Sequence, residues 1–415
     1  MENVFEIFEQ RGFIEQVTDR TMLEDLLREP VTCYIGFDPT AKSLHAGSLL
    51  PIMSLMHMQR QGHRPIAIVG GGTALVGDPS GKTEMRPIMT RDQIDENAAS
   101  IKAQLSRFLD FSDGKALLVN NADWLTELRY IEFLRDIGKH FSVNRMLTAE
   151  SYRTRLETGL NFIEFNYMLL QAYDFLHLFK HYGCRLQMGG NDQWGNILAG
   201  ADLIRRLEGE IVHGLTLPLL TTSTGIKMGK THKGAIWLDP ELTSSYEYYQ
   251  YWINQADADI KRFLALFTFL PMGEVKRLGA LEGSELNHAK EILAFEATRI
   301  CHGEKEAEKA RNASRSLFGG GEGDVSSDTP TFSLDAGELA YGIEAFILFS
   351  NCGLCKTRAE ARRLISQGGA YLNGIKVESA ETRVNSDHLK NGAILLRAGK
   401  KRYMRILAKP EGVKE

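Results

Sequence analysis

The sequence has few cysteines, no long apolar run and no membrane-spanning stretch. Five cysteines are spread over 415 residues, and this odd number argues against a disulfide framework and favours reduced thiols. No segment has the uninterrupted apolar length that a bilayer requires. Residues 1–20 carry five acidic side chains and no apolar run, unlike a secretory signal or an Arg-rich transit peptide. These absences predict a cytoplasmic protein that does not bind a membrane.

Metal ligands are also scarce. Cys352 and Cys355 have the CxxC spacing of half a zinc site or of a redox pair. No second CxxC and no nearby pair of histidines completes four ligands. We therefore expect no metal site and no tightly bound cofactor.

Charge is distributed unevenly along the chain. Residues 341–415 contain 14 basic and 7 acidic side chains, a net charge of +7, whereas the first 340 residues contain 35 and 46, a net charge of −11. A basic module on an acidic body is typical of proteins that bind a polyanion, although a solvated basic surface explains the charge equally well.

The order of apolar segments predicts an α/β fold with several domains. Short apolar runs at 31–36, 65–69, 115–120 and 184–188 are expected strands, and 49–61 is an expected helix between the first two. We expect a Rossmann-like parallel-sheet domain over 1–235, a helical domain over 236–318 and a Gly/Ser-rich linker over 319–333. A small basic α+β domain would occupy 334–415, with a helix at 356–367, a turn region at 368–374 and short strands after it.

Two short segments far apart in the chain are suited to binding phosphate groups. His45-Ala46-Gly47-Ser48 follows the turn-rich run 36–40, where a strand, a tight loop and a helix start would direct backbone N–H groups at an anion. Lys227-Met228-Gly229-Lys230-Thr231 places two ammonium groups three residues apart in a loop. Together these segments predict a site that splits a polyphosphate.

The glycine-rich stretch 70–83 is not a P-loop. A P-loop requires glycine five positions before the Gly of Gly-Lys-Thr, and Val76 stands there. We expect the backbone of this stretch to approach a small ligand closely, beside a loop that carries Lys82 and Arg86. A purely structural turn is the alternative.

Polar residues on one expected helix face form another candidate site. Tyr167, Gln171 and Asp174 are spaced i, i+4 and i+7 within the run 162–179 and therefore share a face. Their apolar neighbours make such a polar stripe costly unless each group is hydrogen-bonded, either by a ligand or within the core. The run 187–193 turns through two glycines into Asp192 and Gln193, which suit ribose hydroxyls or an Asx turn.

Six blocks along the chain resemble bacterial-type tyrosyl-tRNA synthetases, a family of class I aminoacyl-tRNA synthetases, and the resemblance extends over nearly the whole chain. Residues 45–48 resemble the HIGH motif and 227–231 the KMSKS motif; further matching blocks are 34–40, 77–82, 171–174 and 190–195. Three positions differ from the family pattern. Ser48 replaces the second histidine of HIGH, Gly229 and Thr231 replace the serines of KMSKS, and Pro51 falls in the first helix turn, where it costs little.

The resemblance implies a two-step reaction in which tyrosine attacks the α-phosphorus of ATP and the tyrosyl group then passes to tRNA(Tyr). Magnesium would accompany ATP, and no side chain would act as a nucleophile. Stabilisation of charge on the transferring phosphate would fall to positioned polar and cationic groups. The catalytic residues implied are Thr40, His45, Ser48, Lys82, Arg86, Lys227 and Lys230.

The resemblance also implies the binding residues and partners. Asp174 and Tyr34 would bind the phenol of L-tyrosine; the full tyrosine set is Tyr34, Asp78, Tyr167, Gln171, Asp174 and Gln193. The ATP set is Gly36, Asp38, His45, Gly47, Ser48, Asp192, Lys227, Met228 and Lys230. The last domain resembles a small ribosomal RNA-binding fold, in which Lys356, Arg358, Arg362 and Arg363 would contact tRNA phosphates. A homodimer is implied, with 123–154 as its interface.

Two other functions remain open from sequence alone. Another nucleotidyltransferase of the HIGH class would not need the helical domain and the basic tail. A catalytically silent RNA-binding protein on the same scaffold would be expected to have a damaged lysine loop or amino-acid pocket, and both are intact here.

Overall fold

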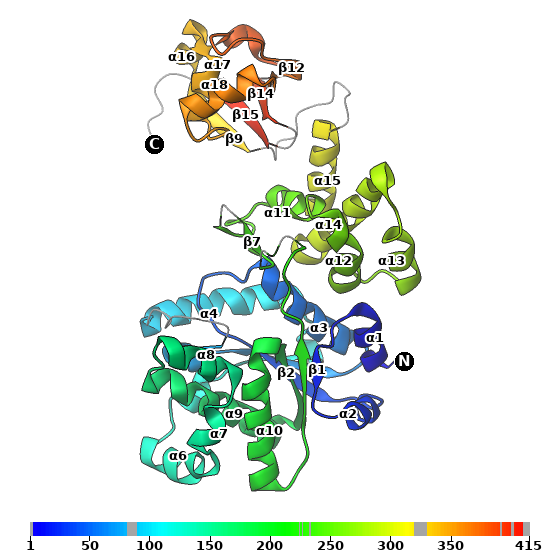
Figure 1. Cartoon of the computed structure of the whole chain (residues 1–415), viewed down its shortest axis with the longest axis vertical. Coiled ribbons are helices and arrows are strands. Elements are labelled where there is room, and N and C mark those ends of the chain that lie inside the picture. Colours follow the sequence, from blue (N-terminus) through cyan, green and yellow to red (C-terminus); the bar gives the residue numbers. More distant parts are fainter. Residues whose placement is uncertain are drawn as a thin grey trace. The chain divides into compact units, whose positions relative to one another are not determined.

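The chain forms two compact units, Met1–Ala307 and Glu308–Glu415, and the division falls within helix α15 (Glu304–Phe318). This computed structural model describes residues 3–80, 89–223, 225, 227–231, 234–318, 330–390, 392–399 and 402–409 (Figure 1). None of the helices in these ranges has both the length and the apolar character needed to cross a bilayer.

The first unit is built on a six-stranded sheet. In spatial order its strands are β1 (Gln16–Val17), β6 (His213–Leu217), β5 (Cys184–Gly190), β2 (Thr32–Phe37), β3 (Arg64–Val69) and β4 (Leu117–Asn120). All neighbours are parallel except the edge pair β1 and β6. The chain extends the sheet from β2 in one direction through β3 and β4, and later in the other through β5 and β6. Ligands bind beyond the carboxyl ends of strands at such a reversal point.

Helices cover the two faces of this sheet (Figure 1). Side chains alternate across a strand, so Tyr34, Ile66 and Ile68 share one face, where they form a core with helices α9 (Phe162–Tyr182) and α10 (Trp194–Glu208). Helices α3 (Leu49–Arg60) and α4 (Arg91–Leu105) lie on the other face and contact β3. The strands and the first helix predicted from the sequence correspond to β2, β3, β4, β5 and α3.

Short elements and a helical segment complete the first unit. The remaining elements before the helical segment are α1 (Val4–Arg11), α2 (Arg20–Leu26), α5 (Ala122–Leu125), α6 (Tyr130–Asp136), α7 (Val143–Met146), α8 (Glu150–Thr158), β7 (Lys230–Thr231) and β8 (Gly234–Ala235). The helical segment comprises α11 (Ser245–Ile253), α12 (Ile260–Phe267), α13 (Met272–Leu278) and α14 (Leu286–His302). Trp252 and Phe263 are fully buried in its core.

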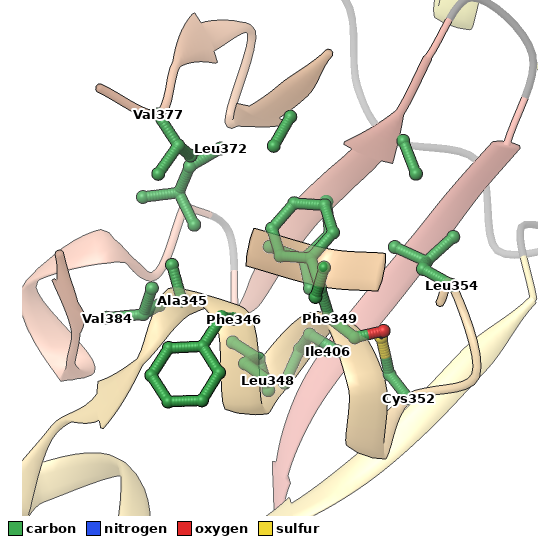
Figure 2. Packing of buried hydrophobic residues seen from close by; sticks show 14 of the residues in the cluster. Ala345, Phe346, Leu348, Phe349, Cys352, Leu354, Leu372, Val377, Val384 and Ile406 are labelled. Carbon is green, nitrogen blue, oxygen red and sulfur yellow. The ribbon is translucent and has the colours of Figure 1, made fainter. Parts of the chain in front are cut away.

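The second unit is a small α+β domain. Its five-stranded sheet has the order β12 (Ile375–Lys376), β11 (Ala370–Leu372), β14 (Ala393–Ala398), β15 (Arg402–Lys409) and β9 (Thr331–Asp335). The other elements are α16 (Ala336–Tyr341), β10 (Ile343–Glu344), α17 (Ala345–Asn351), α18 (Arg358–Ser366) and β13 (Arg383–Val384). Figure 2 shows how Phe349 of α17 and Ile406 of β15 pack into one apolar cluster.

One local prediction for this unit was wrong. The stretch 368–374 was expected to be a turn region, but it contains strand β11, in which Ala370 and Leu372 are buried in the core. The glycines that suggested a turn flank the strand: Gly368 and Gly374 have φ angles of 71° and 84°. They reverse the chain on either side of a three-residue strand, which is too short to give a clear alternation in the sequence.

Candidate active site

A cavity of about 440 Å³ opens at the carboxyl ends of β2 and β5. Most of the predicted site residues line it, although they come from distant segments of the chain. The predicted residues that line it are Tyr34, Gly36, Asp38, Thr40, His45, Gly47, Ser48, Asp78, Tyr167, Gln171, Asp174, Asp192 and Gln193. The structure therefore brings the proposed tyrosine residues and most of the proposed ATP residues into one continuous space.

The remaining predicted residues are placed differently. Lys227 is exposed and Met228 is buried beside the cavity. Lys82, Arg86 and the side chain of Lys230 lie outside the part of the chain that the structure describes. The four basic residues predicted to bind RNA belong to the second unit: Lys356, Arg358, Arg362 and Arg363 are all exposed at or near α18.

Backbone hydrogen bonds join the two segments that the sequence predicts to bind phosphate. Ala46 N donates to the carbonyl of Ile236 at 2.8 Å, and Ile236 N donates to the carbonyl of Gly229 at 2.9 Å. Leu238 N also donates to the carbonyl of Leu44 at 2.8 Å. Residues 236–238 thus connect the HIGH-like turn to the lysine loop, which we define as residues 227–231. About 180 residues separate the two segments in sequence, yet these hydrogen bonds hold the lysine loop beside the HIGH-like turn that lines the cavity.

Two glycines allow this close approach. A Cβ atom on Gly47 would lie 2.7 Å from the Met228 carbonyl oxygen, and one on Gly229 would lie 2.5 Å from Gly47 N. Gly229 also has a φ angle of 78°, which side-chain-bearing residues rarely adopt. Glycine at the position where KMSKS has serine is therefore required by this backbone contact.

His45 is oriented by its own turn. Its Nδ1 accepts a hydrogen bond from Gly47 N at 3.0 Å, so the side chain caps the short helix that precedes α3. Because Nδ1 accepts, the proton of the neutral imidazole resides on Nε2, which can act as a donor. Ser48 and Pro51, in the turn that opens α3, line the same cavity.

At the deep end of the cavity, a carboxylate and a phenol lie close together. Asp174 is 3% exposed and accepts hydrogen bonds from Asn121 Nδ2 at 2.9 Å and from Trp124 Nε1 at 2.7 Å. Burial raises the pKa of Asp174 to about 7, although these two hydrogen bonds oppose the rise. The Tyr34 hydroxyl is buried and has no hydrogen-bond partner in the described part of the chain. This pair suits a ligand hydroxyl that donates to Asp174 and accepts from Tyr34.

An aromatic stack holds Trp124, the indole that donates to the Asp174 carboxylate. The His177 ring lies parallel to the Trp124 indole, with centroids 4.2 Å apart and planes 11° apart. His181 continues the stack, with its centroid 4.3 Å from that of His177. Because Asp174, His177 and His181 all belong to α9, this helix fixes the orientation of the indole whose N–H binds the carboxylate.

Nearer the cavity mouth, amides and carboxylates form a connected network. Gln193 Nε2 donates to Asp78 Oδ2 at 2.7 Å, and Asn196 Nδ2 donates to Gln171 Oε1 at 3.0 Å and to Gln193 Oε1 at 3.1 Å. The Tyr167 hydroxyl donates to Asp38 Oδ2 at 2.9 Å. These acceptor groups line the same cavity as Asp174, so they can bind an ammonium group while the other end of the ligand contacts Asp174.

One stripe of α9 runs through the whole site. Tyr167, Gln171 and Asp174 share a helical face, as their spacing predicts, and all three line the cavity. A capping box between Asn161 and Glu164 starts the helix, and Gly183 in the left-handed conformation ends it. The stripe is therefore carried by one well-defined helix.

The sequence did not single out several residues of this site. Trp124, Gln187, Asn196 and Trp237 contact the predicted residues or line the cavity. Asn121, directly after β4, donates to Asp174 and accepts from Gly72 N of the glycine turn at 2.8 Å. For Asn121 and Trp124, the one available sequence signal was their position just after a strand.

Comparison with known proteins places these features in a family. Residues 26–319 match the family described as tRNA synthetases class I (W and Y), and residues 324–406 match the tyrosine–tRNA ligase SYY-like C-terminal domain. The tyrosine–tRNA ligase of Syntrophus aciditrophicus is 59% identical, over 98% of this chain and 99% of that protein. That of Caldanaerobacter subterraneus subsp. tengcongensis is 55% identical, over 98% of this chain and all of that protein.

Solved structures give the same assignment. A C-terminally truncated mitochondrial tyrosyl-tRNA synthetase of Aspergillus nidulans superposes with a TM-score of 0.70 and 32% identity, covering 77% of this chain and 95% of that one. The predicted resemblance and the predicted fold class are thereby confirmed. The chain belongs to the tyrosine–tRNA ligase family of class I tRNA synthetases.

Proposed function

We infer that the chain ligates L-tyrosine to tRNA(Tyr) in two steps, first forming tyrosyl-adenylate and pyrophosphate from tyrosine and ATP. One observation carries this inference: a single cavity combines a buried Asp174–Tyr34 pair with the HIGH-like turn, and backbone hydrogen bonds link that turn to the lysine loop. The pair suits a phenol, and the linked segments suit a polyphosphate. Relatives named tyrosine–tRNA ligase, which match this chain over nearly their full length, support the same function.

The activation step needs no nucleophile from the protein, because the tyrosine carboxylate itself attacks the α-phosphorus of ATP. Catalysis then consists of positioning the reactants and stabilising negative charge on the transferring phosphate. His45, Ser48 and Thr40 act from the HIGH-like turn, and Lys227 and Lys230 from the lysine loop. Lys82 and Arg86 belong to the same proposed set. Magnesium enters with ATP and is held mainly by the phosphates.

Each substrate has its own part of the cavity. Tyrosine places its phenol between Asp174 and Tyr34, and its ammonium group among Asp78, Tyr167 and Gln171, with Gln193 near its carboxylate. Phenylalanine would leave Asp174 and Tyr34 without a ligand partner, which disfavours its binding.

The nucleotide would bind along the carboxyl ends of β2 and β5. ATP approaches the backbone at Gly36, where an added Cβ would meet no protein atom within 4 Å. It also contacts Asp38, Gly47 and Met228, and Asp192 binds its ribose.

The RNA-binding surface is assigned to the second unit. Lys356, Arg358, Arg362 and Arg363 provide an exposed cationic face at α18 that neutralises tRNA phosphates. We assign catalysis to 1–235, anticodon binding to the helical domain 236–318, the linker to 319–333 and further RNA binding to 334–415. The reaction takes place in the cytoplasm, where its three substrates meet.

We further propose a homodimer. Large exposed apolar side chains gather between residues 130 and 163: Tyr130, Ile131, Val143, Leu156, Phe162 and Ile163. Ile131 and Phe162 are 74% and 70% exposed, which is costly in a monomer and typical of an interface. Replacing both by Asp should give a monomer in analytical ultracentrifugation, whereas Asp at the exposed Ile211 should leave the dimer intact. A dimer that survives the first change would contradict this interface.

The decisive test of the function is tyrosine-dependent exchange of labelled pyrophosphate into ATP, followed by tyrosylation of tRNA(Tyr). Both activities are expected. No exchange with pure, folded protein would refute the enzyme assignment and leave a silent RNA-binding protein. Exchange without tRNA charging would instead indicate another nucleotidyltransferase of the HIGH class.

A further inference from the structure

The lysine loop is held by a tyrosine of the helical segment. Gly229 N donates a hydrogen bond to the Tyr251 hydroxyl oxygen at 3.1 Å. The same hydroxyl donates to Met228 Sδ, also at 3.1 Å. Tyr251 lies on α11, outside the cavity and outside both motifs, so these two bonds connect the helical segment directly to the middle of the loop.

The position of this hydroxyl is fixed by its surroundings. The Tyr251 ring packs edge-on against Trp252, with centroids 5.4 Å apart, and Trp252 is fully buried. A capping box between Ser244 and Glu247 fixes the start of α11. Burial raises the pKa of Tyr251 to about 12, so the hydroxyl keeps its proton and both accepts and donates at neutral pH.

The two residues that Tyr251 holds, Met228 and Gly229, also lie against the HIGH-like turn. The Gly229 carbonyl accepts from Ile236 N, and the Ile236 carbonyl accepts from Ala46 N. The space between Gly229 and Gly47 does not admit even a methyl group. A small displacement of Gly229 would therefore change the placement of the whole loop relative to His45.

The helical segment also anchors the chain that enters the loop. The Asp259 carboxylate, buried at the start of α12, accepts from Ser223 N at 2.9 Å and from Ser223 Oγ at 2.9 Å. Met228 N donates to the Leu220 carbonyl at 2.9 Å. The entry to the loop and its centre are thus both bound to residues of the same helical segment.

We propose that Tyr251 is a positioning residue for tyrosine activation, which holds Met228 and Gly229 so that the flanking lysines reach the phosphates of ATP. The proposal rests on the function inferred above. Tyr251 contacts neither substrate and acts only through the loop. The helical segment that is assigned to the anticodon thereby contributes directly to the geometry of the activation site.

The test is Tyr251→Phe, which removes both hydrogen bonds and retains the ring that packs on Trp252. The loss of each hydrogen bond is expected to lower the rate by about twofold to tenfold. The kcat for pyrophosphate exchange should therefore fall by about tenfold. The KM for tyrosine and the Tm should stay close to the wild-type values, because Asp174 and the helical core are untouched. The matched control is Tyr248→Phe, since the Tyr248 ring packs against His302 within the helical core at 4.8 Å. It should leave kcat unchanged.

A double-mutant cycle separates positioning from a general structural effect. If Tyr251 acts through the lysines, Tyr251→Phe should have little further effect once Lys227→Ala has been introduced. Additive losses, or a wild-type rate in Tyr251→Phe alone, would overturn the proposal. These outcomes require an active wild-type protein, whereas wild-type protein that shows no exchange contradicts the inferred function instead.

Discussion

Removing the Asp174 carboxylate should change the choice between tyrosine and phenylalanine. In the proposed complex, Asp174 accepts a hydrogen bond from the substrate phenol, while Asn121 and Trp124 hold the carboxylate in place. A hydrogen bond to a charged group contributes about 1.5–3 kcal/mol, which corresponds to roughly 10-fold to 150-fold in affinity. Asp174→Ala should therefore weaken tyrosine by about that factor. Phenylalanine, which has no hydroxyl, should change by less than about threefold.

The assay is pyrophosphate exchange driven by each amino acid in turn, with KM measured for both. Asp78→Ala is the matched control, because Asp78 lies in the network assigned to the ammonium group that both amino acids carry. It should weaken tyrosine and phenylalanine by similar factors. A thermal melt confirms that each variant is folded. Equal losses for the two amino acids in Asp174→Ala would refute the assignment of Asp174 to the phenol.

Four further measurements test other parts of the site. Burial raises the pKa of Asp174 to about 7, and the ionised carboxylate accepts a stronger hydrogen bond from the phenol than the protonated acid does, so tyrosine affinity should fall by up to about tenfold in all as the pH drops below 7, while phenylalanine affinity stays flat; calorimetry between pH 5.5 and 8.5 checks this. Ser48→Ala should slow adenylate formation in rapid-quench experiments by about threefold to tenfold, and an unchanged rate would mean that Ser48 does not contribute. Gly229→Ser, which introduces a clash with Gly47 and a strained φ angle, should lower pyrophosphate exchange by about tenfold or more without altering tyrosine binding. Arg362→Ala should leave exchange unchanged but weaken tRNA binding and reduce its salt dependence by about one ion; an unchanged salt slope would exclude a phosphate contact.

Local patterns were sufficient to predict the sheet and the polar stripe of α9 that lines the cavity. The apolar runs of β2, β3 and β5 end in glycine, and the parallel arrangement then brings their polar ends together. Likewise, the i, i+4, i+7 spacing placed Tyr167, Gln171 and Asp174 on one face of α9. These inferences need only the periods of strands and helices.

Contacts between distant segments could not be predicted in this way. Trp124 follows β4 and looks like an ordinary core residue until α9 brings Asp174 and His177 against its indole. Tyr251 has no motif around it, and its role depends on how α11 packs beside the lysine loop. The glycine at 229 looked like a departure from the family motif, and the reason for it is a backbone contact with Gly47.

The polar stripe on α9 fixes the distance between two ends of the cavity. Tyr167 and Asp174 are seven residues apart on one rigid helix, so at 1.5 Å per residue their Cα atoms are about 10 Å apart along its axis. This distance is set by helix geometry and not by flexible loops. The helix therefore sets the distance between the end that we propose binds the ammonium group and the end that we propose binds the phenol. Deleting one residue between them would rotate one end by about 100° relative to the other, and both ends could no longer contact the same amino acid.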